Sequence, residues 1–261
     1  MVVLSLTLGG VVGILLSAGF VWWEIGRYAT PQVPVTVFDE RKVLAAYTVG
    51  LFVGVPLAAA YLLLVTSLTN AALYGAAVFL GGLVVGTEVA QRWVERSAYW
   101  GSTPAAPFYA VSLRAGIGGI LAIAAVASYL GTVTTPTVLG TLSTVLTAIA
   151  LVALEVAGGL LSTRRPSAVS SRPGSPWAGG LFGAVAFFLL GIGPTAGPLG
   201  ALAAPVVVLA GALTTYRRGR RILAEVPAPT GPAPALATDR PLPYGRTGSA
   251  PAGEPGESER R

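Results

Sequence analysis

Three ionisable side chains lie inside segments whose composition is otherwise that of hydrocarbon: Glu88, Arg114 and Glu155. A charge at the centre of a membrane helix costs about 2.5–3.5 kcal/mol even on the lenient insertion scale, so each of these charges needs a partner or a task. Helical spacing puts Arg114 and Glu155 about 9 Å inside the same end of consecutive segments, and Glu88 within about one turn of that end. The sequence therefore predicts an intramembrane charge cluster of these three residues.

Two interpretations of this cluster remain open. In the first, Arg114 pairs with Glu155 and latches two helices together, while Glu88 pairs with Arg92, four residues further along the same helix. In the second, Glu155 binds a proton or a cation, and Arg114 adjusts that affinity or holds an anionic substrate. The shallow depth lowers the cost of the charges, and this favours the latch.

The elements that must position these residues are seven apolar segments, none of which alternates polar and apolar residues. About 20 residues of helix, at about 1.5 Å each, cross the hydrocarbon core of a bilayer. The sequence therefore predicts an all-α integral membrane protein, a seven-helix transmembrane bundle within residues 1–221. The expected spans are residues 2–23, 43–68, 71–90, 108–130, 138–161, 177–193 and 197–216.

Basic residues occupy alternate connections between these segments and leave the others empty. Because connections rich in Lys and Arg stay in the cytoplasm, the pattern predicts an outside N-terminus and a cytoplasmic C-terminus. The run RRGRR, which follows the last segment, is expected to anchor the topology and to bind anionic lipid head groups. The basic residues concerned are Arg27, Arg41, Lys42, Arg92, Arg96, Arg164, Arg165, Arg172, Arg217, Arg218, Arg220 and Arg221.

Two proline-containing stretches need separate treatment. Residues 222–261 are rich in proline and poor in branched aliphatic side chains, which predicts a disordered cytoplasmic tail. Residues 191–205 contain Pro194, Pro198 and Pro205 and form either a plain tight turn or a re-entrant element. The turn is favoured.

Small residues spaced four apart indicate where the helices approach one another closely. Arg114 shares one helical face with Ala110, Gly118 and Ala122, so this face is expected to meet other helices rather than lipid. The candidate glycine pairs are Gly9 with Gly13, Gly50 with Gly54, Gly82 with Gly86, and Gly179 with Gly183.

Composition excludes most catalytic chemistry. The chain has no histidine and no cysteine, which removes Ser–His and Cys–His catalysis, Cys/His metal sites and disulfides. Its two aspartates, Asp39 and Asp239, lie outside the apolar segments, so an intramembrane aspartyl protease is excluded as well. We expect no enzyme activity, no cofactor and no metal site. Magnesium binding by Asp39 and Glu40 is the remaining enzymatic option, although a helix N-terminal cap is the simpler interpretation.

The resulting hypotheses rank as follows. The first is a multi-pass protein of the cell membrane without catalytic chemistry, a subunit or accessory of a membrane assembly. The alternative is a small permease or ion-coupled transporter that uses Glu155 and Arg114, and a membrane-embedded enzyme ranks third. Expected partners are the lipid bilayer and either other membrane subunits or further copies of the chain, but not nucleic acid. The strong preference for arginine over lysine indicates a prokaryotic origin.

Overall fold

The computed structural model describes residues 2–28, 39–100, 105–133, 135–163 and 178–224. Within these ranges the secondary structure is helical and contains no strand. The elements are α1 (Val2–Tyr28), α2 (Glu40–Thr69), α3 (Leu73–Arg96), α4 (Ala106–Thr132), α5 (Val138–Ser162), α6 (Ala178–Ile192), the 3-10 turn η1 (Gly193–Ala196) and α7 (Gly197–Ala224).

Length and composition indicate a membrane protein. Among the described residues, five helical stretches are long and apolar enough to cross a bilayer: α2, α3, α4, α5 and the stretch Ala178–Gly219, which runs from α6 into α7. Helix α1 contributes the shorter apolar stretch Gly9–Trp23. The all-helical class predicted from the sequence is therefore confirmed for the described part of the chain.

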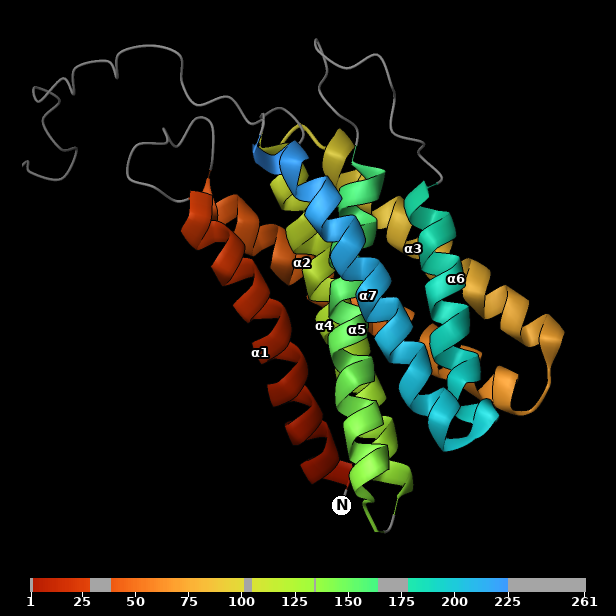
Figure 1. Ribbon diagram of the computed structural model, residues 1–261. Coiled ribbons are helices and arrows are strands. Elements are labelled where there is room, and N and C mark those ends of the chain that lie inside the picture. The colour runs from red at the N-terminus through yellow and green to blue at the C-terminus, as the bar shows by residue number, and fades with distance from the viewer. Residues whose placement is uncertain (1, 29–38, 101–104, 134, 164–177, 225–261) are drawn as a thin grey trace, which may run out of the picture. The chain divides into compact units, whose positions relative to one another are not determined.

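The chain reverses direction between α6 and α7, so that these two helices form an antiparallel hairpin (Figure 1). The reversal is made by η1, and Gly197, with a φ of 82°, begins the next helix. This left-handed conformation favours glycine, because the Cβ of any other residue would crowd its own backbone there. Within residues 191–205 the structure thus shows the turn η1 and the first turns of α7, and the choice of a plain turn over a re-entrant element stays a prediction.

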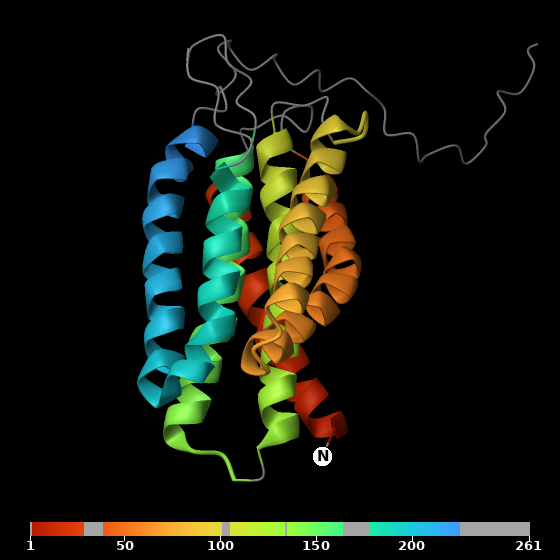
Figure 2. The same cartoon turned by 90° about the vertical axis from the view of Figure 1, so that its right-hand side faces the viewer.

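One end of the bundle collects the basic residues. The C-terminal ends of α1, α3, α5 and α7 lie at the same end as the N-terminal ends of α2, α4 and α6 (Figures 1 and 2). Within the described residues this end, called the basic end below, carries Arg41, Lys42, Arg92, Arg96, Arg217 and Arg218. The turns at the opposite end carry neither Lys nor Arg among their described residues.

Several helices extend past the apolar spans expected from the sequence. Helix α1 continues to Tyr28, α3 to Arg96 and α7 to Ala224. Polar residues can continue a helix beyond the apolar stretch, so hydropathy marks the span and not the helix end. Residues 222–224, which the prediction assigned to the disordered tail, are thus the last turn of α7. The rest of the predicted tail lies outside the described residues.

Helix α4 is the central helix, and it packs against α1, α2, α3 and α5. Its predicted contact face is buried as expected: Ala110, Arg114, Gly118 and Ala122 are all shielded from the surface. Small residues are needed on this helix because neighbouring backbones approach it closely.

The prediction that glycine pairs mark close helix contacts is confirmed at some positions and wrong at others. Gly13 on α1 and Gly50 on α2 lie so close to the α4 backbone that an added Cβ would collide with it. Gly82 has no atom within 4 Å of such a Cβ, so its prediction as a helix contact was wrong. The spacing alone could not distinguish a glycine facing a helix from a glycine on an outer face.

The start of α2 is fixed at the basic end. The Asp39 carboxylate accepts a hydrogen bond of 2.9 Å from the backbone N–H of Arg41, which confirms the N-cap interpretation of this stretch. Lys42 donates through Nζ to the carbonyl of Tyr99 at 2.7 Å, and the indole N–H of Trp100 donates to the carbonyl of Lys42 at 3.2 Å. These bonds hold the start of α2 against the segment that follows α3.

Candidate functional site

The three ionisable residues predicted to form a cluster come from three helices, and their side chains are in contact. Arg114 lies on α4, between Glu88 on α3 and Glu155 on α5. Its Nη2 is 2.6 Å from Glu88 Oε1, and its Nη1 is 2.8 Å from Glu155 Oε2. The side chains of Arg114 and Glu155 are 4% and 1% exposed, and that of Glu88 is 13% exposed. One guanidinium therefore bridges two carboxyl groups inside the bundle.

Two further side chains complete the network, and the sequence reasoning missed both. Arg114 Nε donates to Gln91 Oε1 at 2.9 Å, and Gln91 Nε2 in turn donates to the carbonyl of Gly159 at 3.0 Å and to Glu95 Oε1 at 2.9 Å. Ser162 Oγ donates to Glu88 Oε1 at 2.7 Å. Gln91 is a polar residue one helical turn after Glu88, just past the expected apolar span 71–90, and this spacing was the signal that could have identified it.

Glycines provide the space that this network occupies. A Cβ on Gly159 would lie 3.0 Å from Arg114 Cγ, and a Cβ on Gly118 would lie 3.2 Å from Glu155 Cβ. On α6, a Cβ on Gly179 would lie 3.2 Å from Glu88 Oε1. Contacts this close leave no room for a larger side chain, so the glycines on α4, α5 and α6 are part of what positions the charges.

The charges in the cluster do not balance. Two carboxyl groups face one guanidinium, so the trio carries one negative charge in excess when both carboxyl groups are ionised. Glu88 Oε2 is buried and has no hydrogen-bond partner among the described residues. An uncompensated charge in a low-dielectric interior is strongly unfavourable. A proton on one of the two carboxyl groups would neutralise the trio.

The predicted lipid-head anchor lies apart from this cluster. Arg217 and Arg218 are exposed on α7 at the basic end. Arg220 and Arg221 belong to the last turns of the same helix, and their side chains lie outside the described part of the structure. Both of these side chains are therefore open to contact from outside the protein, whereas the side chain of Arg114 is buried.

The arrangement of the cluster suits two tasks. It can tie α3, α4 and α5 together through charge-assisted hydrogen bonds, which are stronger than hydrogen bonds between neutral groups. It can also hold one proton in place of the missing positive charge. No relative bears on the choice between these tasks: the chain matches no protein-family model, no curated protein and no solved structure.

Proposed function

We propose that this chain is a seven-span protein of the cell membrane, with its N-terminus outside and its basic end in the cytoplasm. Its role is non-catalytic: it serves as a subunit or accessory of a membrane assembly. The charge network between α3, α4 and α5 fixes the arrangement of these helices. The gathering of basic residues at one end supports the orientation, because moving arginines across lipid is costly.

The observation that carries the non-catalytic role is the enclosure of Arg114. Its guanidinium is bonded to Gln91, Glu88 and Glu155, and its side chain is almost fully buried. A groove of about 480 Å³ between α3 and α6 is lined by Glu88 and Arg92, but not by Arg114 or Glu155. An arginine that holds a substrate needs donors facing open space, whereas these donors face protein side chains.

The outer surface of the helix bundle is apolar, as expected for contact with lipid or with another membrane subunit. Large apolar side chains such as Phe52 on α2 and Leu181 on α6 are well exposed. In a membrane, such surfaces face acyl chains or the helices of another subunit.

Single cysteines on either side of α4 will test whether this helix crosses the membrane and in which direction. The chain contains no cysteine, so each variant carries a single reactive thiol. Ala98→Cys places it after α3 at the basic end, and Thr135→Cys places it between α4 and α5, both at exposed positions. We expect a membrane-impermeant maleimide to label Thr135→Cys in intact cells and Ala98→Cys only after permeabilisation. Labelling in the reverse order, or of both positions from outside, contradicts the proposed topology.

A second function, an ion-coupled carrier, is favoured by one specific observation. The buried Glu88 Oε2, which has no partner among the described residues, and the excess carboxyl group together leave a place for a single proton. A carrier of this kind would load and release that proton through Glu155 or Glu88, and Arg114 would stabilise the deprotonated form.

Reconstitution distinguishes the two functions. From the non-catalytic role we expect proteoliposomes under a pH gradient to show no proton flux above that of protein-free liposomes, and stoichiometric partners to co-purify from native membranes. A flux that Glu155→Gln reduces at least tenfold would instead establish the carrier. The matched control is Glu40→Gln, an exposed carboxyl group at the start of α2 that lies outside the cluster.

A further inference from the structure

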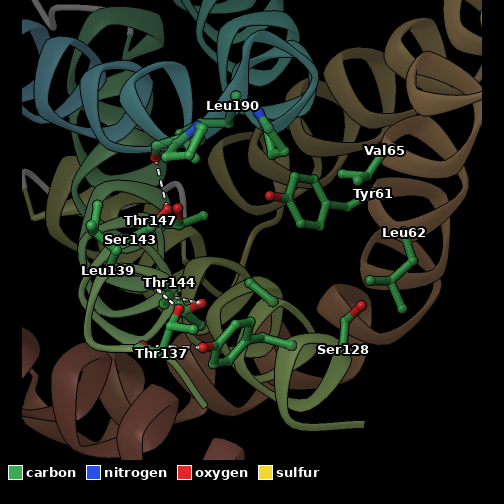
Figure 3. Close-up of a pocket in the computed structure, with 17 residues that line it drawn as sticks. Tyr61, Leu62, Val65, Ser128, Thr137, Leu139, Ser143, Thr144, Thr147 and Leu190 are labelled. Carbon is green, nitrogen blue, oxygen red and sulfur yellow. Dashed lines mark hydrogen bonds between the residues drawn. The ribbon is translucent and has the colours of Figure 1, made fainter. Parts of the chain in front are cut away.

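A cavity of about 690 Å³ lies at the end of the bundle opposite the basic end. Its walls come from α2, α4, α5 and the α6–η1–α7 hairpin, and Figure 3 shows the lining side chains around an open centre. The volume falls within the range typical of small-molecule sites, which is about 300–1,000 Å³. None of the three charged residues of the cluster lines this cavity.

One largely buried side chain in the cavity wall carries a hydroxyl group that has no partner among the described residues. Tyr61 on α2 is 3% exposed, and its hydroxyl makes no hydrogen bond to any residue that the structure describes. Figure 3 shows this hydroxyl pointing into the open centre, toward the side of the cavity that carries Thr147. A hydroxyl group that faces a cavity without bonding to the protein is free to bond to a ligand atom there.

Two neighbouring hydroxyl groups on α5 are already engaged within the protein. Ser143 Oγ donates to the carbonyl of Ala201 at 2.7 Å, and Thr144 Oγ1 donates to the carbonyl of Gly140 at 2.8 Å. The first bond ties α5 to α7, and the second lies within α5. Tyr61 is therefore the hydroxyl group in this wall that is both deeply buried and available.

The character of the walls restricts the ligand. Every polar side chain that lines the cavity is a neutral hydroxyl of Ser, Thr or Tyr, and the rest of the lining is apolar, including Leu62, Val65 and Leu190. An ion would lose its hydration there without meeting an opposite charge. An uncharged molecule with an apolar body and one hydrogen-bonding group matches the wall.

We propose that this cavity binds an uncharged amphiphile whose hydroxyl or carbonyl group hydrogen-bonds to Tyr61. Such a molecule can come from the bilayer, as a neutral lipid or long-chain alcohol, or from the water, as a small alcohol. The binding site is separate from the charge cluster, because Leu121 on α4 and Leu151 on α5 lie between the two along their helices and are fully buried. The inference therefore holds whether the cluster is a latch or a proton site.

The test uses the full chain in lipid nanodiscs and a dodecanol analogue carrying a photoreactive diazirine. After irradiation, peptide mass spectrometry locates the adducts, and a concentration series gives the apparent affinity. We expect saturable adducts in the α2 and α5 segments that contain Tyr61 and Thr147. Tyr61→Phe keeps the shape of the side chain and removes its hydroxyl, so it should weaken binding about fivefold, the size of one hydrogen bond. Tyr74→Phe, at a tyrosine that is 86% exposed and outside the cavity, should change nothing.

Competitors identify the source and the charge of the ligand. Competition by dodecanol alone assigns the site to a bilayer molecule, and competition by cyclohexanol as well assigns it to a water-soluble one; either result supports the site. Equal competition by dodecanesulfonate, which keeps its negative charge, overturns the proposal. So do adducts that never saturate and spread over lipid-facing residues, or an unchanged affinity in Tyr61→Phe. Thr147→Phe fills the cavity and should abolish the saturable adducts, and Tyr61→Phe remains decisive if that variant does not fold.

Discussion

Replacing Arg114 by glutamine will lower the stability of the protein by about 3–5 kcal/mol, the usual result of removing one partner from a buried ion pair. The variant leaves Glu155, with a side chain only 1% exposed, facing Glu88 without the cation that separated them. For a chain of this size the loss corresponds to a fall in Tm of roughly 10 °C. Thermal unfolding of the purified protein in detergent, followed by circular dichroism, provides the measurement.

We expect the loss of stability in Arg114→Gln to come from the lost charge and not from the changed shape of the side chain. A second variant separates these two causes. Adding Glu155→Gln to Arg114→Gln removes the more deeply buried of the two carboxylates left without a cation, so the double variant should be more stable than Arg114→Gln alone. Arg218→Gln provides the matched control, because Arg218 is exposed on α7 at the basic end. If Arg114→Gln unfolds within about 2 °C of the unaltered protein, a shift too small for a lost buried ion pair, the network does not hold the three helices together.

Replacing Gly50 by leucine will separate α2 from α4 and reduce stability by about 3 kcal/mol, the upper part of the range for overpacked interiors. A Cβ on Gly50 would lie 2.9 Å from the carbonyl carbon of Leu113 and 3.1 Å from its Cα. A backbone atom cannot move aside as the end of a flexible side chain can. The two helices must therefore move apart and lose contacts along their length. The yield of folded protein after size-exclusion chromatography and the Tm in detergent will both report the change.

Gly81 offers a control of the same residue type in a neighbouring helix. It lies within α3, is exposed, and has no atom within 4 Å of the position that a Cβ would take. Gly81→Leu gains the same helix propensity as Gly50→Leu, so the difference between the two variants measures packing alone. Equal stabilities for the two variants would show that the close approach of α2 and α4 contributes nothing.

Hydropathy and charge identified the helical segments because both depend only on the residues of one segment and not on the segments packed against it. An apolar run of about 20 residues is driven into a helix by the need to pair its own backbone groups, whatever its neighbours are. The alternation of basic connections likewise predicted which helix ends would gather at one end of the bundle. The charge-bearing positions Glu88, Arg114 and Glu155 followed from the same counting, because spacing along a helix gives depth.

The rotation of each helix about its own axis was decided by the tertiary structure. Gly50 and Gly82 each belong to a pair of glycines spaced four residues apart. Gly50 lies against α4, whereas a Cβ on Gly82 would have no atom within 4 Å. Which side of a helix faces its neighbour depends on how the irregular surfaces of the two helices pack together. The packing of the helices also placed Gln91 and Ser162 within hydrogen-bond distance of the charge cluster. It directs the Tyr61 hydroxyl into a cavity. Hydropathy thus determined which segments form helices, and side-chain packing between distant segments decided which polar groups find partners and which, such as Glu88 Oε2 and the Tyr61 hydroxyl, find none among the described residues.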